Sequence, residues 1–205
     1  MNIKKSLNVA IALLLPFTLH AADMENGKEL SRTCALCHGK FMQGVAGDIY
    51  PRLAGLPSGY TENELQRLKD GRRKAHLPML ITSMVDTMSA ADMEDVSVYL
   101  EHMTIPTAHV RAIPRPTYGN SAAGKNIYLE EECDGCHKKD GSGKAKKGIP
   151  PLKGQHTDYM LKQFEDFKNI ARIHDGEDEK DDSSFVDMNP DILRDLVAYI
   201  STFDD

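Results

Sequence analysis

The sequence predicts an all-α protein built as two tandem halves. Apolar residues recur at helical spacing in several segments, no segment shows the strict alternation of a half-buried strand, and the second half of the chain repeats the first. Of the 205 residues, 40% are hydrophobic and 27% are charged, which is typical of a globular chain. The formal charge of −6 argues against a protein that binds nucleic acid.

The N-terminus has the composition of a secretory signal peptide. Lys4 and Lys5 form a positive start, a mostly apolar stretch follows over residues 7–15, and the small residues Ala21 and Ala22 suit cleavage. An uncleaved membrane anchor is the alternative, which the shortness of the apolar stretch disfavours. We therefore expect export to the periplasm of a bacterial host and no transmembrane segment in the mature chain.

The internal repeat appears as a nearly constant offset between matching residues. A shift of 99 residues carries Cys34 onto Cys133 and Tyr60 onto Tyr159, and the shift becomes 100 toward the end of each half. A stretch rich in proline separates the two copies. The predicted parts are a signal peptide over 1–22, a first domain over 23–103, a proline-rich linker over 104–117 and a second domain over 118–205.

Each half is expected to contain three helices in the same order. The first leads up to a cysteine motif, and the second follows Tyr60 or Tyr159. The third carries apolar residues at helical spacing and begins after Ser89 or Asn189, which are suitable N-cap residues. Pro190 suits the first turn of the last helix.

All four cysteines lie in two copies of one motif, CALCH at 34–38 and CDGCH at 133–137. The pattern C-x-x-C-H is typical of covalent haem attachment. On a helix, positions i and i+3 share a face, so both thiols reach the vinyl groups of one porphyrin and the following histidine reaches the iron. A zinc site would leave the paired histidines unexplained, and a redox C-x-x-C lacks a βαβ context. The motifs therefore predict two covalently bound haem c groups, with attachment at Cys34, Cys37, Cys133 and Cys136 and iron ligation by His38 and His137.

From residue 23 onward the chain resembles the dihaem class I cytochromes c, specifically the cytochrome c4-like group. The resemblance is carried by both C-x-x-C-H motifs, the Pro-x-Leu-x-Gly stretches at 51–55 and 150–154, the middle helices that follow tyrosine, and final helices ending in Tyr-Leu and Tyr-Ile. It implies two tandem class I cytochrome c domains, each wrapped around one covalent haem, with the haem edges close together. It also implies periplasmic electron transfer between redox partner proteins.

The resemblance implies that a methionine supplies the second iron ligand of each haem, from a loop before the final helix. In the first half Met79 lies twenty residues before Tyr99 and is the first choice. Met84 is the alternative, and Met88 and His76 are weaker ones.

The second half departs from this pattern, because the corresponding window at 177–182 contains no methionine. His174 precedes this window, and a neutral imidazole is a good haem ligand. The alternatives are Met188, Lys180, His156, Met160 and an open iron. Since Met/His ligation raises the haem potential, the first haem is expected to have the higher potential and to receive electrons from the second.

Three functions remain distinguishable at this point. An electron carrier for unidentified donor and acceptor proteins is preferred, in association with a membrane oxidase or a periplasmic dehydrogenase. A haem enzyme, or the haem subunit of an oxidoreductase acting on sulfide or another sulfur compound, would use the atypical second haem. A ligand sensor lacks a recognisable output domain.

Charged residues give weaker signals. Two charged stretches, lysine-rich over 138–147 and acidic over 175–187, are interpreted as solvated loops, with docking of redox partners as the alternative. Three arginines and two tyrosines are candidates for contact with haem propionates, with ordinary surface or core positions as the alternative: Arg72, Arg73, Arg172, Tyr60 and Tyr159.

Overall fold

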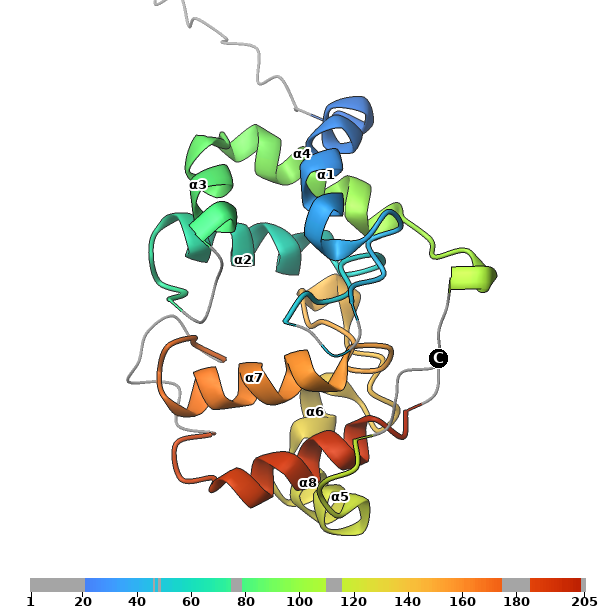
Figure 1. The fold of residues 1–205 in the computed structure, drawn as a ribbon, viewed down its shortest axis with the longest axis vertical. Coiled ribbons are helices and arrows are strands. Elements are labelled where there is room, and N and C mark those ends of the chain that lie inside the picture. The colour runs from blue at the N-terminus through green and yellow to red at the C-terminus, as the bar shows by residue number, and fades with distance from the viewer. Residues whose placement is uncertain are drawn as a thin grey trace, which may run out of the picture.

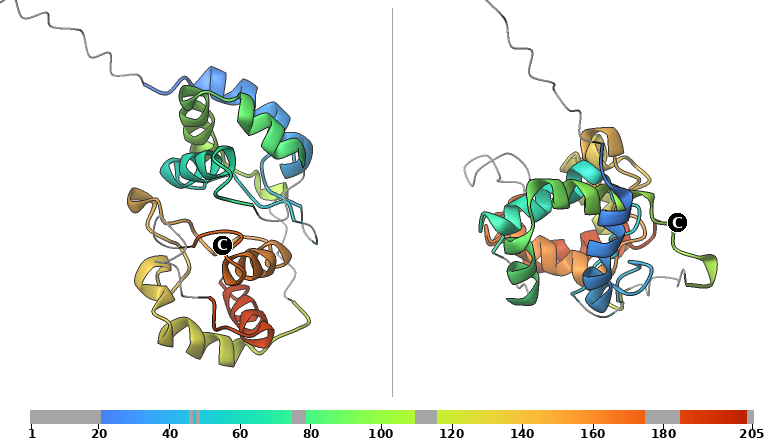
Figure 2. Two further views of the ribbon diagram at one scale, coloured as in Figure 1. Left: turned by 90° about the vertical axis from the view of Figure 1, so that its left-hand side faces the viewer. Right: turned by 90° about the horizontal axis from the view of Figure 1, so that it is seen from above.

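The computed structural model describes residues 21–45, 47, 49–74, 79–109, 116–174 and 185–203, without the side chains of Met79 and Leu80. Its helices form two lobes stacked along the long axis, with α1 to α4 in one and α5 to α8 in the other (Figures 1 and 2). Within these ranges there is no β-strand, and no helix is long and apolar enough to cross a membrane. The helices are α1 (Met24–His38), α2 (Ser58–Lys69), α3 (Met79–Thr87), α4 (Ala90–His102), η1 (Thr107–His109), α5 (Ser121–Glu130), α6 (Cys133–His137), η2 (Ala145–Lys147), α7 (Thr157–Lys168) and α8 (Pro190–Ile200).

The first and last helices of each lobe pack closely, α1 on α4 and α5 on α8. A glycine lies at each crossing, because a Cβ at Gly27 would overlap the carbonyl oxygen of Asp95 and one at Gly124 would overlap that of Asp195. Both aspartates also fasten the start of the partner helix. Asp95 accepts a hydrogen bond from the backbone N–H of Asp23 at 2.7 Å, and Asp195 accepts one from the N–H of Asn120 at 2.6 Å.

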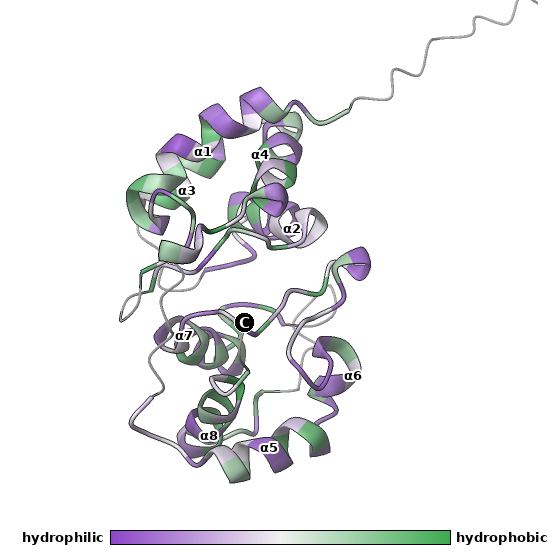
Figure 3. Ribbon diagram, turned by 90° about the vertical axis from the view of Figure 1, so that its right-hand side faces the viewer, coloured by the Kyte–Doolittle hydropathy of each residue, from purple (hydrophilic) through white to green (hydrophobic). Residues whose placement is uncertain are grey.

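The predicted starts of the final helices are confirmed. Ser89 caps α4, and a reciprocal bond to Asp92 completes a capping box. Asn189 caps α8 through its side-chain oxygen, and Pro190 is the first helical residue. Hydrophobic and hydrophilic residues are interspersed along α1, α4, α5 and α8 (Figure 3). The buried residues of α4 and α8 recur at helical spacing, as expected for helices with one side in the core.

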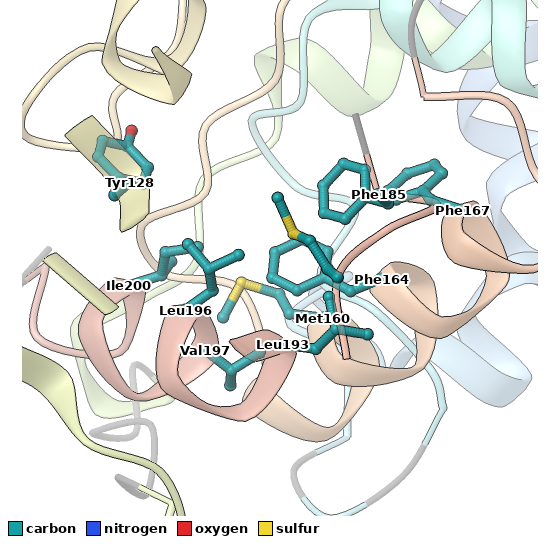
Figure 4. Close-up of a cluster of buried hydrophobic side chains, with 10 residues drawn as sticks. Tyr128, Met160, Phe164, Phe167, Phe185, Leu193, Leu196, Val197 and Ile200 are labelled. Atoms are coloured by element: carbon teal, nitrogen blue, oxygen red, sulfur yellow. The ribbon is translucent and has the colours of Figure 1, made fainter. Parts of the chain in front are cut away.

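The two cores differ in their side chains. The second contains the aromatic residues Tyr128, Phe164, Phe167 and Phe185. The three phenylalanines gather between α7, α8 and the turn before α8, whereas Tyr128 of α5 lies apart from them (Figure 4). The buried residues of the first core are Met42, Ala54, Val96 and Leu100. The few aromatic residues of the chain are therefore concentrated in the second half.

Two elements differ from the sequence-based expectation. The segment expected to be a loop contains helix α3, in which Ile81, Met84 and Val85 recur at helical spacing beside α2. In the second half, the first helix stops at Glu130 and α6 carries the cysteine motif separately. The interruption is a left-handed residue, Glu132, with φ of 54°.

Candidate haem sites

The first motif occupies the last turn of α1. Cys34 and Cys37 are partly buried, and His38 is buried at the helix end. The Nδ1 atom of His38 lies 2.9 Å from the carbonyl oxygen of Pro51, which can only accept a hydrogen bond. The proton is therefore on Nδ1, and Nε2 keeps the lone pair that a metal needs. Burial, opposed by this hydrogen bond, lowers the pKa of His38 and favours the neutral ring.

The second motif has the same arrangement on α6. The Nδ1 atom of His137 donates to the carbonyl oxygen of Pro150 at 3.1 Å. Pro51 and Pro150 are related by the 99-residue repeat, so the same backbone carbonyl orients the histidine in both halves. Cys136 is exposed and Cys133 is partly buried.

Both motifs open into one cavity of about 470 Å³ that runs between the lobes. Cys34, Cys37 and His38 line it from one lobe, and Cys133, Cys136 and His137 line it from the other. The rest of the lining is largely aliphatic and aromatic, as expected for flat, apolar porphyrin rings.

His174 faces His137 across the second part of the cavity. Their ring centroids are 6.1 Å apart, and their planes are inclined by 35°. Two imidazoles that bind one metal from opposite sides, each through a bond of about 2 Å, have centroids roughly 6 Å apart. The His174 ring is held edge-on between Phe167 and Phe185, each at a centroid distance of 5.0 Å.

The other sequence candidates fall into three groups. Met84 and Met88 line the cavity in the first half. Met160 and Met188 are buried in the second core and also line the cavity, whereas His156 donates through Nε2 to the carbonyl oxygen of Gln43 at 2.8 Å. The side chain of Met79, and all of His76 and Lys180, lie outside the described residues.

A buried polar cluster lines the cavity between α2 and α7, two helices that face each other across the two lobes (Figure 1). Arg73 donates to Glu64 of its own half at 2.9 Å, and across the interface to Tyr159 at 3.3 Å and Gln163 at 3.0 Å. Arg172 repeats this pattern in reverse, with Gln163 of its own half at 2.6 Å.

Across the interface, Arg172 donates to Tyr60 at 2.6 Å and pairs with Glu64 at 3.0 Å. Because the repeat relates Arg73 to Arg172, the contact has approximate two-fold symmetry. The symmetry is broken at two matched pairs of positions, which carry a carboxylate at Glu64 against an amide at Gln163, and Arg67 against Asp166.

The cluster contains an excess of positive charge. Arg67, Arg73 and Arg172 surround the carboxylate of Glu64, and all four side chains are at most 13% exposed. Burial raises the pKa of the Glu64 carboxyl, but the guanidinium groups, that of Arg172 most strongly, outweigh burial and hold the pKa below its usual value. Burial also raises the pKa of the Tyr60 hydroxyl to about 12.

Two donors of this cluster fit an anionic cofactor. The Nε atoms of Arg73 and Arg172 are buried beside the cavity and have no hydrogen-bond partner among the described residues. A carboxylate would satisfy both their hydrogen bonding and their charge. Of the arginines predicted to contact haem propionates, Arg73 and Arg172 therefore lie beside the cavity. Arg72 lies at the surface and pairs with Asp70 at 2.9 Å.

Sequence reasoning missed Glu64 of α2 and Gln163 of α7 as members of this cluster. Glu64 and Gln163 are unremarkable polar residues on helices when each half is considered alone. The 99-residue offset was the available signal, since it pairs Arg73 with Arg172 and Tyr60 with Tyr159. Two pairs of polar residues repeated at one fixed offset indicate a shared surface.

Two C-x-x-C-H segments beside one apolar cavity define a site for two covalently attached haems. The family model for cytochrome c matches residues 24–104 and again residues 121–204. Cytochrome c4 of Pseudomonas aeruginosa is 31% identical over 178 residues, which is 83% of this chain and 85% of that protein. A protein of Stutzerimonas stutzeri described as a thiosulfate dehydrogenase electron acceptor is 29% identical over 177 residues, covering 82% of this chain and 80% of the relative.

Solved structures show the same fold. Reduced recombinant cytochrome c4 from Pseudomonas stutzeri superposes with a TM-score of 0.68 at 26% identity, over 89% of this chain and all of that one. The thiosulfate dehydrogenase of Marichromatium purpuratum gives a TM-score of 0.72 at 24% identity over 88% of this chain, which spans only 40% of that longer protein.

The chain belongs to the cytochrome c family, as a two-domain member of the cytochrome c4 type. It carries a covalently bound haem c in each domain and is an electron-carrying cytochrome.

Proposed function

We propose that this cytochrome carries electrons in the periplasm, after residues 1–22 have been removed as a signal peptide. The positive start, short apolar stretch and small residues of that segment support export. Residues 1–20 lie outside the described part of the chain. The proposed mature domains are those of the sequence analysis, 23–103 and 118–205.

The geometry of the two motifs supports a specific attachment. The first haem is held by thioether bonds to Cys34 and Cys37, and the second by bonds to Cys133 and Cys136. When bound, each haem supplies an iron that takes up and gives back one electron. The chain orients the ligands His38 and His137 through the carbonyl groups of two matched prolines.

We infer that His174 is the second ligand of the second haem, and the centroid distance of 6.1 Å to His137 carries this assignment. In the first half the ligand is a methionine of α3, either Met79 or Met84. A thioether favours reduced iron more than an imidazole does, so the first haem has the higher potential. Two filled coordination spheres suit a carrier better than an enzyme.

His174→Ala is expected to convert the second haem from low spin to high spin and to let carbon monoxide bind the reduced protein, because the iron loses its only imidazole on that side. Electron paramagnetic resonance and carbon monoxide difference spectra measure this. His102→Ala is the control, since His102 is an exposed surface residue of α4. A low-spin second haem in the His174 variant would overturn the assignment.

The methionine ligand is identified by three variants, Met79→Leu, Met84→Leu and Met88→Leu. Leucine keeps the apolar volume and removes the sulfur, so one variant alone is expected to lose the thioether-to-iron charge-transfer band and to lower the potential of the first haem. Spectropotentiometry measures both. Loss of the band only in the Met88 variant would contradict the proposal.

We further propose that a dehydrogenase acting on an inorganic sulfur compound is the electron donor, as the description of the Stutzerimonas stutzeri relative suggests. The test mixes the oxidised cytochrome with thiosulfate, with and without a thiosulfate dehydrogenase. Reduction that requires the dehydrogenase is expected. Reduction by thiosulfate alone would favour an enzyme, and no reduction in either mixture would reject this donor.

A further inference from the structure

The segment that carries His174 is held by hydrogen bonds from both halves of the molecule. The N–H groups of Ala171 and Arg172 donate to the carbonyl oxygen of Asp166 on α7, at 2.9 and 3.2 Å. The carbonyl groups of the same segment point the other way. That of Ala171 accepts from the backbone N–H of Lys74 at 2.9 Å, and that of Ile173 accepts from the Arg67 guanidinium at 3.0 Å. The residue directly before His174 is therefore bonded to the first half.

Arg172 provides a second attachment of this segment to the first half. Its guanidinium group is bound by Tyr60 and Glu64 of α2, and it lies over the ring of Phe167 with its central carbon 4.8 Å from the centroid. Phe167 is one of the two rings that hold the imidazole of His174. A buried guanidinium fixed by charged and hydroxyl partners restrains the ring beneath it.

We propose that helix α2 of the first half positions His174, so that ligation of the second iron depends on the closed interface between the halves. This rests on the proposed function, in which His174 is the iron ligand. If the interface opens, the bonds from the first half to the Ile173 carbonyl and to Arg172 are lost together. The segment then keeps its contacts within the second half, with Asp166, Gln163 and the rings of Phe167 and Phe185. The second iron then becomes accessible to external ligands and its potential changes.

The first half then has two functions, since it holds its own haem and sets the ligation of its neighbour. Arg67, Glu64 and Tyr60 are positioning residues in this scheme, because they act on the iron only through residues 171–174. A partner that docks on the first half and shifts α2 would thereby alter the second haem.

The test compares two arginines of the full-length protein with both haems attached. Arg67 and Arg32 each pair with a glutamate three residues earlier on a helix, Glu64 and Glu29. The Arg67 pair is buried and reaches Ile173, whereas both side chains of the Arg32 pair are more than 60% exposed. Arg67→Ala and Arg32→Ala therefore remove the same charge and the same kind of pair.

In Arg67→Ala, carbon monoxide is expected to bind the reduced second haem about tenfold faster or more, since a hydrogen bond to a charged group contributes roughly that factor in equilibrium population. A partial high-spin signal should appear in the oxidised protein. Arg32→Ala should match the parent. Arg67→Lys retains a cationic donor, so its rate of carbon monoxide binding should fall part of the way back to the parental value. A loss of folding alone would not give this intermediate rate.

Tyr60→Phe removes only the hydroxyl that binds Arg172 and preserves the ring. It is therefore the variant to test if Arg67→Ala does not fold. It is expected to raise the carbon monoxide rate in the same direction. The inference is overturned if a folded Arg67→Ala protein binds carbon monoxide at the parental rate while His174→Ala makes the second iron accessible. If the Arg67 variant does not fold, the same result in Tyr60→Phe overturns it. A His174→Ala protein that stays low spin would instead reject the ligand assignment itself.

Discussion

Replacing Cys133 and Cys136 together by alanine is expected to unfold the second half of the molecule, and not only to remove its colour. A domain of about 85 residues has a marginal core of its own, and the covalent haem supplies a large apolar surface at its centre. Without the haem, the cavity beside Phe164, Phe167 and Leu196 has no apolar filling. The stability lost with the haem should exceed the free energy of unfolding of a small domain, which is on the order of 5 kcal/mol.

Far-UV circular dichroism would measure the lost helix, and limited proteolysis with peptide mapping would show which half is cut. The matched variant carries alanine at Cys34 and Cys37, and there the cuts should fall within α1 to α4. A second half that stays helical and melts cooperatively without its haem would contradict the expectation. The same proteolysis result in both variants would show that the halves do not fold as separate units.

Gly124→Ala is expected to destabilise the second half by about 3 kcal/mol, because the added Cβ would overlap the backbone of Asp195 where α5 crosses α8. The helices would have to separate, which also weakens the Asp195 bond to the Asn120 N–H. A fall in Tm of more than about 10 °C should follow for a domain of this size.

Gly59→Ala is the control for this substitution, since Gly59 lies in a helix and a Cβ there meets no atom within 4 Å. Alanine has the higher helix propensity, so this change should be neutral or stabilising by up to about 1 kcal/mol. Chemical denaturation followed by circular dichroism compares the two. Equal stability of the Gly124 variant and the parent would show that the crossing has room to relax.

The elements whose signals are local were predictable from the sequence. Ser89 and Asn189 cap helices as expected, because an N-cap depends on bonds within one turn. The two-half organisation followed from the repeat. The separation of α5 from α6 was not predicted, because a single left-handed residue, Glu132, sets it and carries no characteristic pattern.

The candidate site was predictable to the extent that it lies within single motifs. The cysteine motifs and the proposed ligand His174 could be read from the chain as candidates, but the cluster around Glu64 joins residues about a hundred positions apart. Its geometry depends on how two folded halves pack, which no local pattern encodes. Helix α3 was missed for a related reason, since a short apolar segment after a loop does not by itself distinguish helix from loop.

The mismatched positions of the two-fold interface have a consequence for what a duplicated chain can do. In a dimer of identical chains, every residue at such an interface occurs twice, so a carboxylate at the position of Glu64 would be matched by a second carboxylate at the position of Gln163. Joining the halves in one chain removes that constraint. One copy can keep the acid while the other carries an amide, and one can take a sulfur ligand while the other takes an imidazole. Covalent linkage thus allows the two haem sites of one molecule to differ. Electron transfer in one direction between two haems requires such a difference.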